Sequence, residues 1–308
     1  MAAGRDKGTF YYIPSAVRNN LIIVIGEFCG TFMFLLLAYL GASTAIITNS
    51  PDPESPRPNN PSTVFYIAAA FGISLGVNVW IFFRVSGGIG ILVLPAQLAA
   101  SIGAAALTLV LLPGGKLVIG SALSPQTSII QGLFLEMLLT SQLVLTVYFL
   151  AVEKSRATFL APVGIGLSVF IAHLAGANFS GSSLNPARSF GPAVFAGFEP
   201  YSWIYWLGPF MGALLAYGVY SLLKWMDYKT ANPGQDDDDI ERGTQMQMQP
   251  LMTGTRPAYS SDGVIKISSE GVHDVKGPAR AFNVHPPGAG SPYLNVRFSW
   301  NKDQGSFV

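Results

Sequence analysis

Long apolar runs alternate with short polar segments along most of this chain. A helix needs about 20 apolar residues to cross the hydrocarbon core of a bilayer, and six runs meet that length. They cover residues 21–47, 63–83, 89–112, 130–152, 157–178 and 202–226. The pattern therefore predicts an all-α membrane protein with six transmembrane helices, and the even number places both ends of the chain on one side.

Polar segments rich in Gly, Pro, Ser, Asp and Gln flank this apolar region. Residues 1–17 and 229–308 hold too few clustered apolar side chains to offset the entropy of ordering, and the second segment includes the acidic run 236–239. We expect both to be mostly disordered tails around a transmembrane domain that covers residues 18–228.

The distribution of lysine and arginine predicts which side holds the tails. The cationic residues on that side are Arg5, Lys7, Arg18, Arg84, Lys154, Arg156, Lys224 and Lys229. Arg57 and Lys116 lie on the other side. Because positive charge accumulates in cytoplasmic loops, both termini are predicted to be cytoplasmic. The plasma membrane is the expected location, and an internal membrane stays open as an alternative.

Composition supports this class and narrows the chemistry. Apolar residues make up 50% of the chain, charged residues 11%, and the mean hydropathy is +0.41, which is outside the range of soluble proteins. Three histidines and one cysteine, Cys29, leave no disulfide and no metal cluster. We expect no enzyme activity, no cofactor and no nucleic acid partner.

The first three and the last three apolar runs share landmarks in the same order. The matching pairs are Glu27 and Glu136, the segments that begin at Gly72 and Gly164, Ser86-Gly87 and Ser180-Gly181, and Gly103-Ala104 and Gly212-Ala213. With three helices in each half, the second half enters the membrane from the opposite side. The sequence therefore predicts an inverted repeat, an arrangement that often places a binding site at mid-membrane.

One half of this repeat is shorter than the other. Gly181 and Gly212 are 31 positions apart, whereas Gly87 and Gly103 are 16 apart, so the first half lacks about 15 residues. The shortfall falls after Gly88, where five residues lead directly into the third run. A segment of that length does not span a bilayer, so six helices are still expected.

A polar segment with an arginine lies between two apolar runs and covers residues 180–194. Within it, Asn185 suits a helix cap and Pro186 suits the first turn, so a short helix there would direct backbone N–H groups and partial positive charge to mid-membrane. Arg188 at that depth costs several kcal/mol unless water or a buried acceptor receives it. A pore lining is favoured, and an interfacial loop with a snorkelling arginine is the alternative.

Four segments resemble the aquaporin family, most closely the orthodox water channels of fungi, over residues 20–228. They are Ser183-Leu-Asn-Pro-Ala-Arg-Ser-Phe-Gly-Pro-Ala-Val194, Gly26-Glu-Phe-Cys-Gly-Thr31, Ala70-Phe-Gly72 and Trp203-Ile-Tyr-Trp-Leu-Gly-Pro209. Family members normally carry two Asn-Pro-Ala boxes, each capping a half-helix that dips into the membrane. Here only the second box is present, Asn185, Pro186 and Ala187. The resemblance implies a homotetramer in membrane lipid, with one re-entrant half-helix per chain in place of two.

The resemblance also implies a selectivity constriction at four positions. These map to Phe71, His173, Ser182 and Arg188. Arg188 would repel cations and donate to passing water, while the bulk of Phe71 and His173 favours water over glycerol. An interhelical hydrogen bond is the alternative role for His173.

Two carboxylates, Glu27 and Glu136, lie inside predicted transmembrane runs. The resemblance implies that such residues brace the re-entrant loops, and a proton relay is the alternative. Glu136 should have a loop to hold. Glu27 is expected to have lost its partner together with the first box.

The function implied by the resemblance is passive permeation of water along osmotic gradients. Hydrogen peroxide is a plausible second solute, and glycerol is disfavoured. A single half-helix supplies only about half of the positive mid-pore field that two would supply. A non-conducting aquaporin-like membrane protein with an interaction or signalling role therefore remains the alternative, and a third explanation is an ordinary channel gene from which this form of the sequence has dropped a segment.

Overall fold

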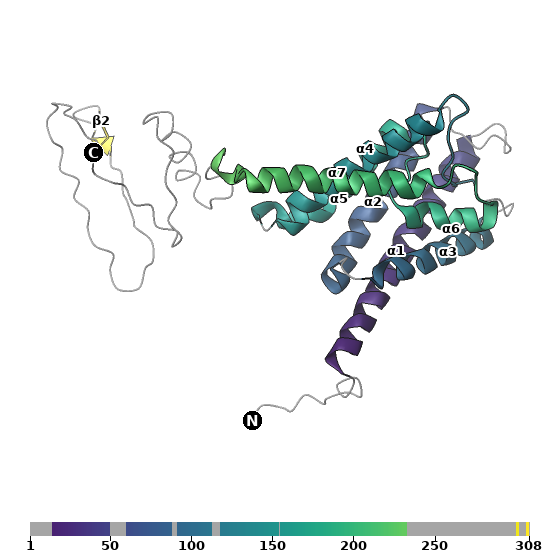
Figure 1. Cartoon of the computed structure of the whole chain (residues 1–308), viewed down its shortest axis with the longest axis horizontal. Coiled ribbons are helices and arrows are strands. Elements are labelled where there is room, and N and C mark those ends of the chain that lie inside the picture. The colour runs from purple at the N-terminus through teal and green to yellow at the C-terminus, as the bar shows by residue number, and fades with distance from the viewer. Residues whose placement is uncertain are drawn as a thin grey trace. The chain divides into compact units, whose positions relative to one another are not determined.

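The structure is a computed structural model, which describes residues 14–49, 60–87, 91–112, 118–153, 155–232, 300–301 and 306–307. The helices are α1 (Ser15–Asn49), α2 (Pro61–Ser86), α3 (Val93–Leu111), α4 (Ile129–Val147), α5 (Ala161–Gly176), α6 (Pro186–Ala196) and α7 (Ile204–Trp225) (Figure 1). A π-helical turn η2 (Tyr148–Val152) extends α4, a 3-10 turn η3 (Arg156–Leu160) precedes α5, and a 3-10 turn η4 (Tyr228–Thr230) follows α7.

Six of these helices are long and apolar enough to cross a membrane, which confirms the six predicted runs. They are Ser15–Thr48, Pro61–Ser86, Val93–Leu111, Ile129–Val152, Ala157–Gly176 and Ile204–Trp225. Helix α6 differs because its 11 residues extend about 16 Å at 1.5 Å per residue, roughly half the thickness of the hydrocarbon core. It is the half-helix that the sequence predicts.

Several helices begin and end where the sequence carries a capping signal. The Asn60 side chain accepts a hydrogen bond from the backbone N–H of Ser62 at 2.9 Å, and Pro61 opens α2. Ser128 and Gln131 form a reciprocal capping box at the start of α4. Gly87 ends α2 with a φ of +69°, a conformation that suits a residue without a Cβ.

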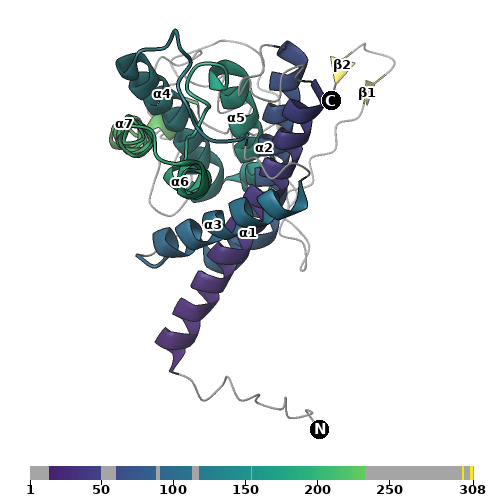
Figure 2. The same ribbon diagram turned by 90° about the vertical axis from the view of Figure 1, so that its right-hand side faces the viewer.

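The two halves of the repeat pack side by side within the membrane domain. In the first half α1 packs on α2 and α3, and in the second half α4 packs on α7 and α5. The halves join where α2 meets α5: a Cβ on Gly72 would lie 2.7 Å from the carbonyl oxygen of Gly166, so only glycine permits this approach. Helix α3 lies against α6 as well (Figures 1 and 2).

The halves differ in what connects their second and third spanning helices. In the second half, residues 177–203 separate α5 from α7 and include α6. In the first half, α2 ends at Ser86 and α3 begins at Val93, so only residues 87–92 separate them. Six residues are too few for a half-helix and its return loop, so the inverted repeat contains one half-helix among the described residues.

The chain divides into two units, Met1–Met248 and Gln249–Val308. In the second unit, the described part is a two-residue antiparallel pairing of β1 (Trp300–Asn301) with β2 (Ser306–Phe307). The predicted disorder of residues 1–17 and 229–308 falls mostly outside the described residues. Helix α1 begins at Ser15, three residues before the predicted start of the transmembrane domain.

Candidate functional site

A strained loop leads from α5 into the half-helix α6. Gly181, Ser182 and Leu184 have φ angles of +82°, +46° and +54°. For the two residues that carry a Cβ, such a conformation costs on the order of 1–3 kcal/mol each and persists only where the surroundings over-determine it. The loop must therefore be held by contacts from outside itself.

Glu136 of α4 supplies most of those contacts. Its Oε1 accepts from the Ser180 hydroxyl at 2.6 Å and from the Ser183 N–H at 2.9 Å, and its Oε2 accepts from the Leu184 N–H at 2.9 Å. The carboxylate is completely buried. Tyr205 of α7 adds a fourth contact, because its hydroxyl donates to the Ser180 carbonyl at 2.9 Å. The loop that Glu136 was expected to hold is present and bonded to it.

The Asn-Pro-Ala box forms the start of α6. The Asn185 Oδ1 accepts from the Ala187 N–H at 2.9 Å, and Pro186 occupies the first turn, where its missing N–H costs nothing. The cap uses the oxygen of the Asn185 amide and leaves its Nδ2 group as a donor. The other N–H groups of the first turn and the helix dipole add partial positive charge at the same end.

The four residues predicted to form a constriction are buried and lie together. The rings of Phe71 and His173 stack with centroids 4.4 Å apart and planes 20° from parallel. The guanidinium carbon of Arg188 lies 4.8 Å from the centre of the Phe71 ring. Ser182 donates to the carbonyl oxygen of Ala172, beside His173, at 3.0 Å.

Two nitrogen atoms of this cluster are buried without a hydrogen-bond partner among the described residues. They are Nε2 of His173 and Nε of Arg188. The other ring nitrogen of His173 lies 2.9 Å from the Val169 carbonyl, which fixes the ring orientation and makes Nδ1 the donor. Nε2 is then an acceptor and the Arg188 Nε–H a donor, so the cluster offers both functions to a small polar molecule.

Two cavities meet at these side chains. One, the loop cavity, has a volume of about 260 Å³ and is lined by Arg188, Ser121, Ser189 and Phe71 among others. The second, the central cavity, has a volume of about 310 Å³ and is lined by Phe71, His173, Asn185 and Arg188 among others. Phe71 and Arg188 line both, so these two side chains lie at the boundary between the two spaces.

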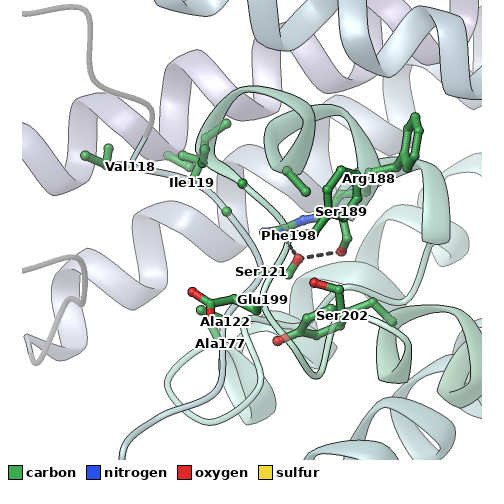
Figure 3. Close-up of a pocket in the computed structure, with 18 of the residues that line it drawn as sticks. Val118, Ile119, Ser121, Ala122, Ala177, Arg188, Ser189, Phe198, Glu199 and Ser202 are labelled. Carbon is green, nitrogen blue, oxygen red and sulfur yellow. Dashed lines mark hydrogen bonds between the residues drawn. The ribbon is translucent and has the colours of Figure 1, made fainter.

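A chain of serine hydroxyls positions Arg188. Its Nη1 donates to Ser121, and the Ser121 hydroxyl lies 2.5 Å from that of Ser189 (Figure 3). The Ser189 hydroxyl in turn lies 2.5 Å from that of Ser183. Ser183 donates its single hydroxyl proton to the Asn185 carbonyl at 3.1 Å, so it must accept from Ser189. Ser189 in turn must accept from Ser121, and all the hydrogen bonds of the chain point the same way. Hydrogen bonds aligned in this way reinforce one another.

Two of the residues that position Arg188 lie far from it in sequence. Ser121 belongs to the loop after α3, and Tyr39 of α1 donates its hydroxyl to the Arg188 carbonyl at 2.6 Å. Nothing in the local pattern around Ser121 distinguishes it from other loop serines. Tyr39 carries a weak signal, because a tyrosine inside an apolar run must find a partner for its hydroxyl.

Glu27 was expected to have lost its loop partner, and it is bonded to side chains of two helices. Its Oε1 accepts from Ser86 at the end of α2 at 2.5 Å, and its Oε2 accepts from Nε2 of Gln97 on α3 at 2.8 Å. The short connection between α2 and α3 brings these two side chains to it. Side chains on helices thus fill the role at Glu27 that the loop fills at Glu136 in the other half.

Comparison with known proteins identifies the family of this chain. The model of the major intrinsic protein family matches residues 90–220. An aquaporin-1 of Gibberella zeae is 57% identical over 245 residues, covering 73% of this chain and 76% of the relative. An aquaporin-7 and an aquaporin-2 of Botryotinia fuckeliana are 40% and 48% identical over 82% and 73% of this chain. The chain spans only 60% and 64% of the length of these two relatives.

A structural relative supports the fold. The aquaglyceroporin of Plasmodium falciparum superposes with a TM-score of 0.55 and 17% identity, covering 65% of this chain and 95% of that one. Six spanning helices, a half-helix and a buried polar cluster between two cavities define an integral, multi-pass membrane protein of the channel class. With the sequence relatives, they show that the chain belongs to the aquaporin family of major intrinsic proteins.

Proposed function

We propose that this chain is a passive water channel driven by osmotic gradients, with Phe71, His173, Ser182 and Arg188 as its selectivity constriction. The observation that carries the proposal is a pair of buried nitrogens, Nε2 of His173 and Nε of Arg188, at the junction of two cavities. Neither has a hydrogen-bond partner in the part of the chain that the structure describes. Burying polar atoms without partners costs about 1–3 kcal/mol each. A pore that passes water relieves that cost.

The same residues favour water over larger solutes. Phe71 and His173 supply bulk, and the Arg188 guanidinium opposes cations. Hydrogen peroxide resembles water in size and hydrogen bonding and is the expected second permeant, whereas glycerol is disfavoured. The half-helix box, Asn185, Pro186 and Ala187, contributes the polar segment of the pore.

The membrane placement follows from charge and family resemblance. We place both termini in the cytoplasm, because the lysines and arginines near the helix ends collect on that side. The proposed location is the plasma membrane, and the proposed assembly is a homotetramer in which each chain has its own pore.

One observation favours the alternative, a non-conducting member of the family with an interaction or signalling role. The rings of Phe71 and His173 lie 4.4 Å apart and nearly parallel, so no water fits between them. In a conducting channel, water would pass beside this stacked pair or the Phe71 ring would move away from His173.

Swelling or shrinkage of vesicles that contain the purified chain tests the proposal. Water flux well above that of empty vesicles, with a low activation energy, is the expected result. Flux equal to that of empty vesicles would establish the non-conducting alternative. Insertion of an Asn-Pro-Ala half-helix segment after Gly88 is the paired variant, and it shows how much of the flux depends on the second half-helix.

The His173→Gly variant tests the constriction separately. Removing the imidazole also removes the ring that stacks on Phe71, so glycerol flux should rise by about tenfold or more while water flux persists. Gly218→Ala, at an open position on α7, is the control variant. Unchanged glycerol flux in a water-conducting protein would refute the placement of the constriction at His173.

A further inference from the structure

A third cavity lies where the first half of the repeat lacks a half-helix. This space, the Glu27 cavity, has a volume of about 200 Å³. Its polar lining residues are Glu27, Thr31, Asn78, Ser86, Gln97 and Asn185. They come from α1, α2 and α3, with Asn185 the contribution of the other half. The loss of one pore segment has therefore left a space whose walls combine these polar groups with apolar side chains such as Phe34, Leu75 and Phe82.

The six polar residues give the Glu27 cavity the hydrogen-bond partners that ordered water needs. Cavities with apolar walls stay dry, whereas those with several polar partners hold ordered water, and 200 Å³ is enough for several molecules. Glu27 and Asn78 are only 8% and 5% exposed, so their polar atoms lie deep in the protein. A carboxylate has about four acceptor positions, and the bonds from Ser86 and Gln97 use two.

Gln97 lies at the junction between the Glu27 cavity and the central cavity. Both spaces are lined by Gln97 and Asn185, together with the apolar side chains Phe34 and Leu75. Each half of the repeat thus contributes one amide to the junction. Gln97 comes from α3 in the first half, and Asn185 caps α6 in the second.

The two amides present complementary groups to the junction. Gln97 uses its Nε2 to donate to Glu27 at 2.8 Å, which leaves its Oε1 as an acceptor. Asn185 uses its Oδ1 to accept from Ala187 at 2.9 Å, which leaves its Nδ2 as a donor. An acceptor facing the same space as a donor fits a small neutral molecule that both donates and accepts, such as water or hydrogen peroxide.

We propose that the Glu27 cavity is a hydrated arm of the permeation path and that Gln97 is a specificity-determining residue at its junction with the central cavity. Glu27 acts through Gln97 as a positioning residue, because it fixes which end of the amide faces the path. The role of Gln97 in permeation rests on the proposed water channel, whereas the hydration of the cavity does not.

The first experiment compares water flux through the Gln97→Leu and Gln142→Leu variants of the full chain in vesicles. Both changes replace an amide by an apolar group of similar size, but Gln142 is exposed on α4 and lines none of the three cavities. We expect Gln97→Leu to lower water flux about fivefold or more, with a higher activation energy, and Gln142→Leu to match the wild type. Equal flux in the two variants would overturn the role of Gln97 and leave the water channel itself standing.

The second experiment tests hydration without requiring conduction. Thr31 lines the Glu27 cavity, whereas Ser43 of the same helix is fully buried and lines none of the three cavities. In a Cys29→Ala background, we expect the Thr31→Cys variant to react quickly with a small charged methanethiosulfonate reagent in detergent, and Ser43→Cys to react slowly. Equally slow reaction would overturn the hydrated cavity.

The two experiments together separate this inference from the proposed function. If the wild type does not conduct, the water channel fails and the role of Gln97 fails with it, while the reaction of Thr31→Cys still decides whether the cavity holds water. If the wild type conducts but Thr31→Cys is unreactive, the channel stands and its path does not pass through the Glu27 cavity.

Discussion

Glu136 and Glu27 occupy matching positions on α4 and α1, yet they bind different kinds of partner. Glu136 accepts two backbone N–H groups and one hydroxyl from residues 180–184. Within the described ranges, Glu27 accepts from two side chains that stand on helices, Ser86 and Gln97. Both carboxylates have hydrogen-bond partners, but among the described residues Glu136 alone organises a loop.

The difference shows what a re-entrant segment contributes beyond filling space. Side chains from neighbouring helices can satisfy a buried carboxylate once a loop is absent. They do not supply an oriented set of backbone N–H groups or a helix dipole, which come only with a half-helix. The second half therefore contributes the positive end of α6, and the first half contributes a polar cavity.

The largest expected effect comes from neutralising the two carboxylates in parallel. The Glu136 carboxylate accepts hydrogen bonds from two N–H groups and a hydroxyl. Glu136→Gln replaces one carboxylate oxygen with an NH₂ group, so a buried donor of the loop loses its acceptor, at a cost of about 1–3 kcal/mol. Glu27→Gln should cost less, because Ser86 and Gln97 are partly exposed and can rotate. Thermal unfolding of the purified variants in detergent measures both costs. Equal losses would show that the two halves hold their carboxylates in equivalent ways.

A somewhat smaller effect is expected where the first half supports the half-helix of the second. A Cβ on Gly191 of α6 would lie 2.4 Å from the carbonyl oxygen of Ser101 on α3. Gly191→Ala should therefore push α6 away from α3 and cost about 1–3 kcal/mol, as overpacking usually does. The matched control is Gly218→Ala, where nothing lies within 4 Å. If the two variants unfold at the same temperature, α3 does not brace α6.

The serine chain gives the next prediction. Ser121→Ala removes the acceptor of the Arg188 Nη1 and the donor to Ser189, so we expect a loss of about 1 kcal/mol and a higher ratio of glycerol to water permeability. Ser168→Ala on α5 is the control, because the buried Ser168 hydroxyl has no partner among the described residues. A Ser121→Ala variant with the wild-type stability and permeability ratio would mean that Arg188 is positioned by Tyr39 alone.

Much of the fold was predictable because it rests on local signals. The six apolar runs are long enough to be recognised without any neighbour, and Asn185 with Pro186 marks the start of α6 by its capping chemistry. The shorter first half was visible as unequal spacing between repeated landmarks. Predicting the bonds between Glu136 and the loop took one further step. A buried carboxylate needs donors, and the family resemblance identifies the loop as the segment that supplies them.

The parts that sequence reasoning missed depend on residues brought together from distant segments. Ser121 lies 67 positions before Arg188, and Gln97 lies 70 positions after Glu27. Gln97 did carry a signal, because an amide inside an apolar run needs a polar neighbour. The identity of that neighbour depends on the length of the connection between α2 and α3. The residues around Gln97 do not reveal which neighbour it is.

The smallest expected effect lies at Glu153, directly after the spanning segment Ile129–Val152. A hydrogen bond from Tyr220 at 2.7 Å, together with ion pairs to Lys224 and Lys229 at 2.9 and 3.1 Å, lowers the pKa of Glu153 from 4.5 to about 2. Since the folded-state pKa lies below the unfolded value, the stabilisation is complete above about pH 4.5 and is lost as the pH falls toward about 2. Both lysine side chains are about half exposed, so solvent and salt screen the effect.

The Glu153→Gln variant checks this sign. It should lower the unfolding temperature in detergent slightly at about pH 7 and much less at about pH 3, because the wild type has by then lost part of the same interaction. Glu199→Gln, at an exposed loop position, is the control and should follow the wild type throughout. A Glu153→Gln deficit that grows as the pH falls would contradict the lowered pKa. A deficit as large as that of Glu136→Gln would mean that this ion cluster stabilises the second half as strongly as the buried loop does.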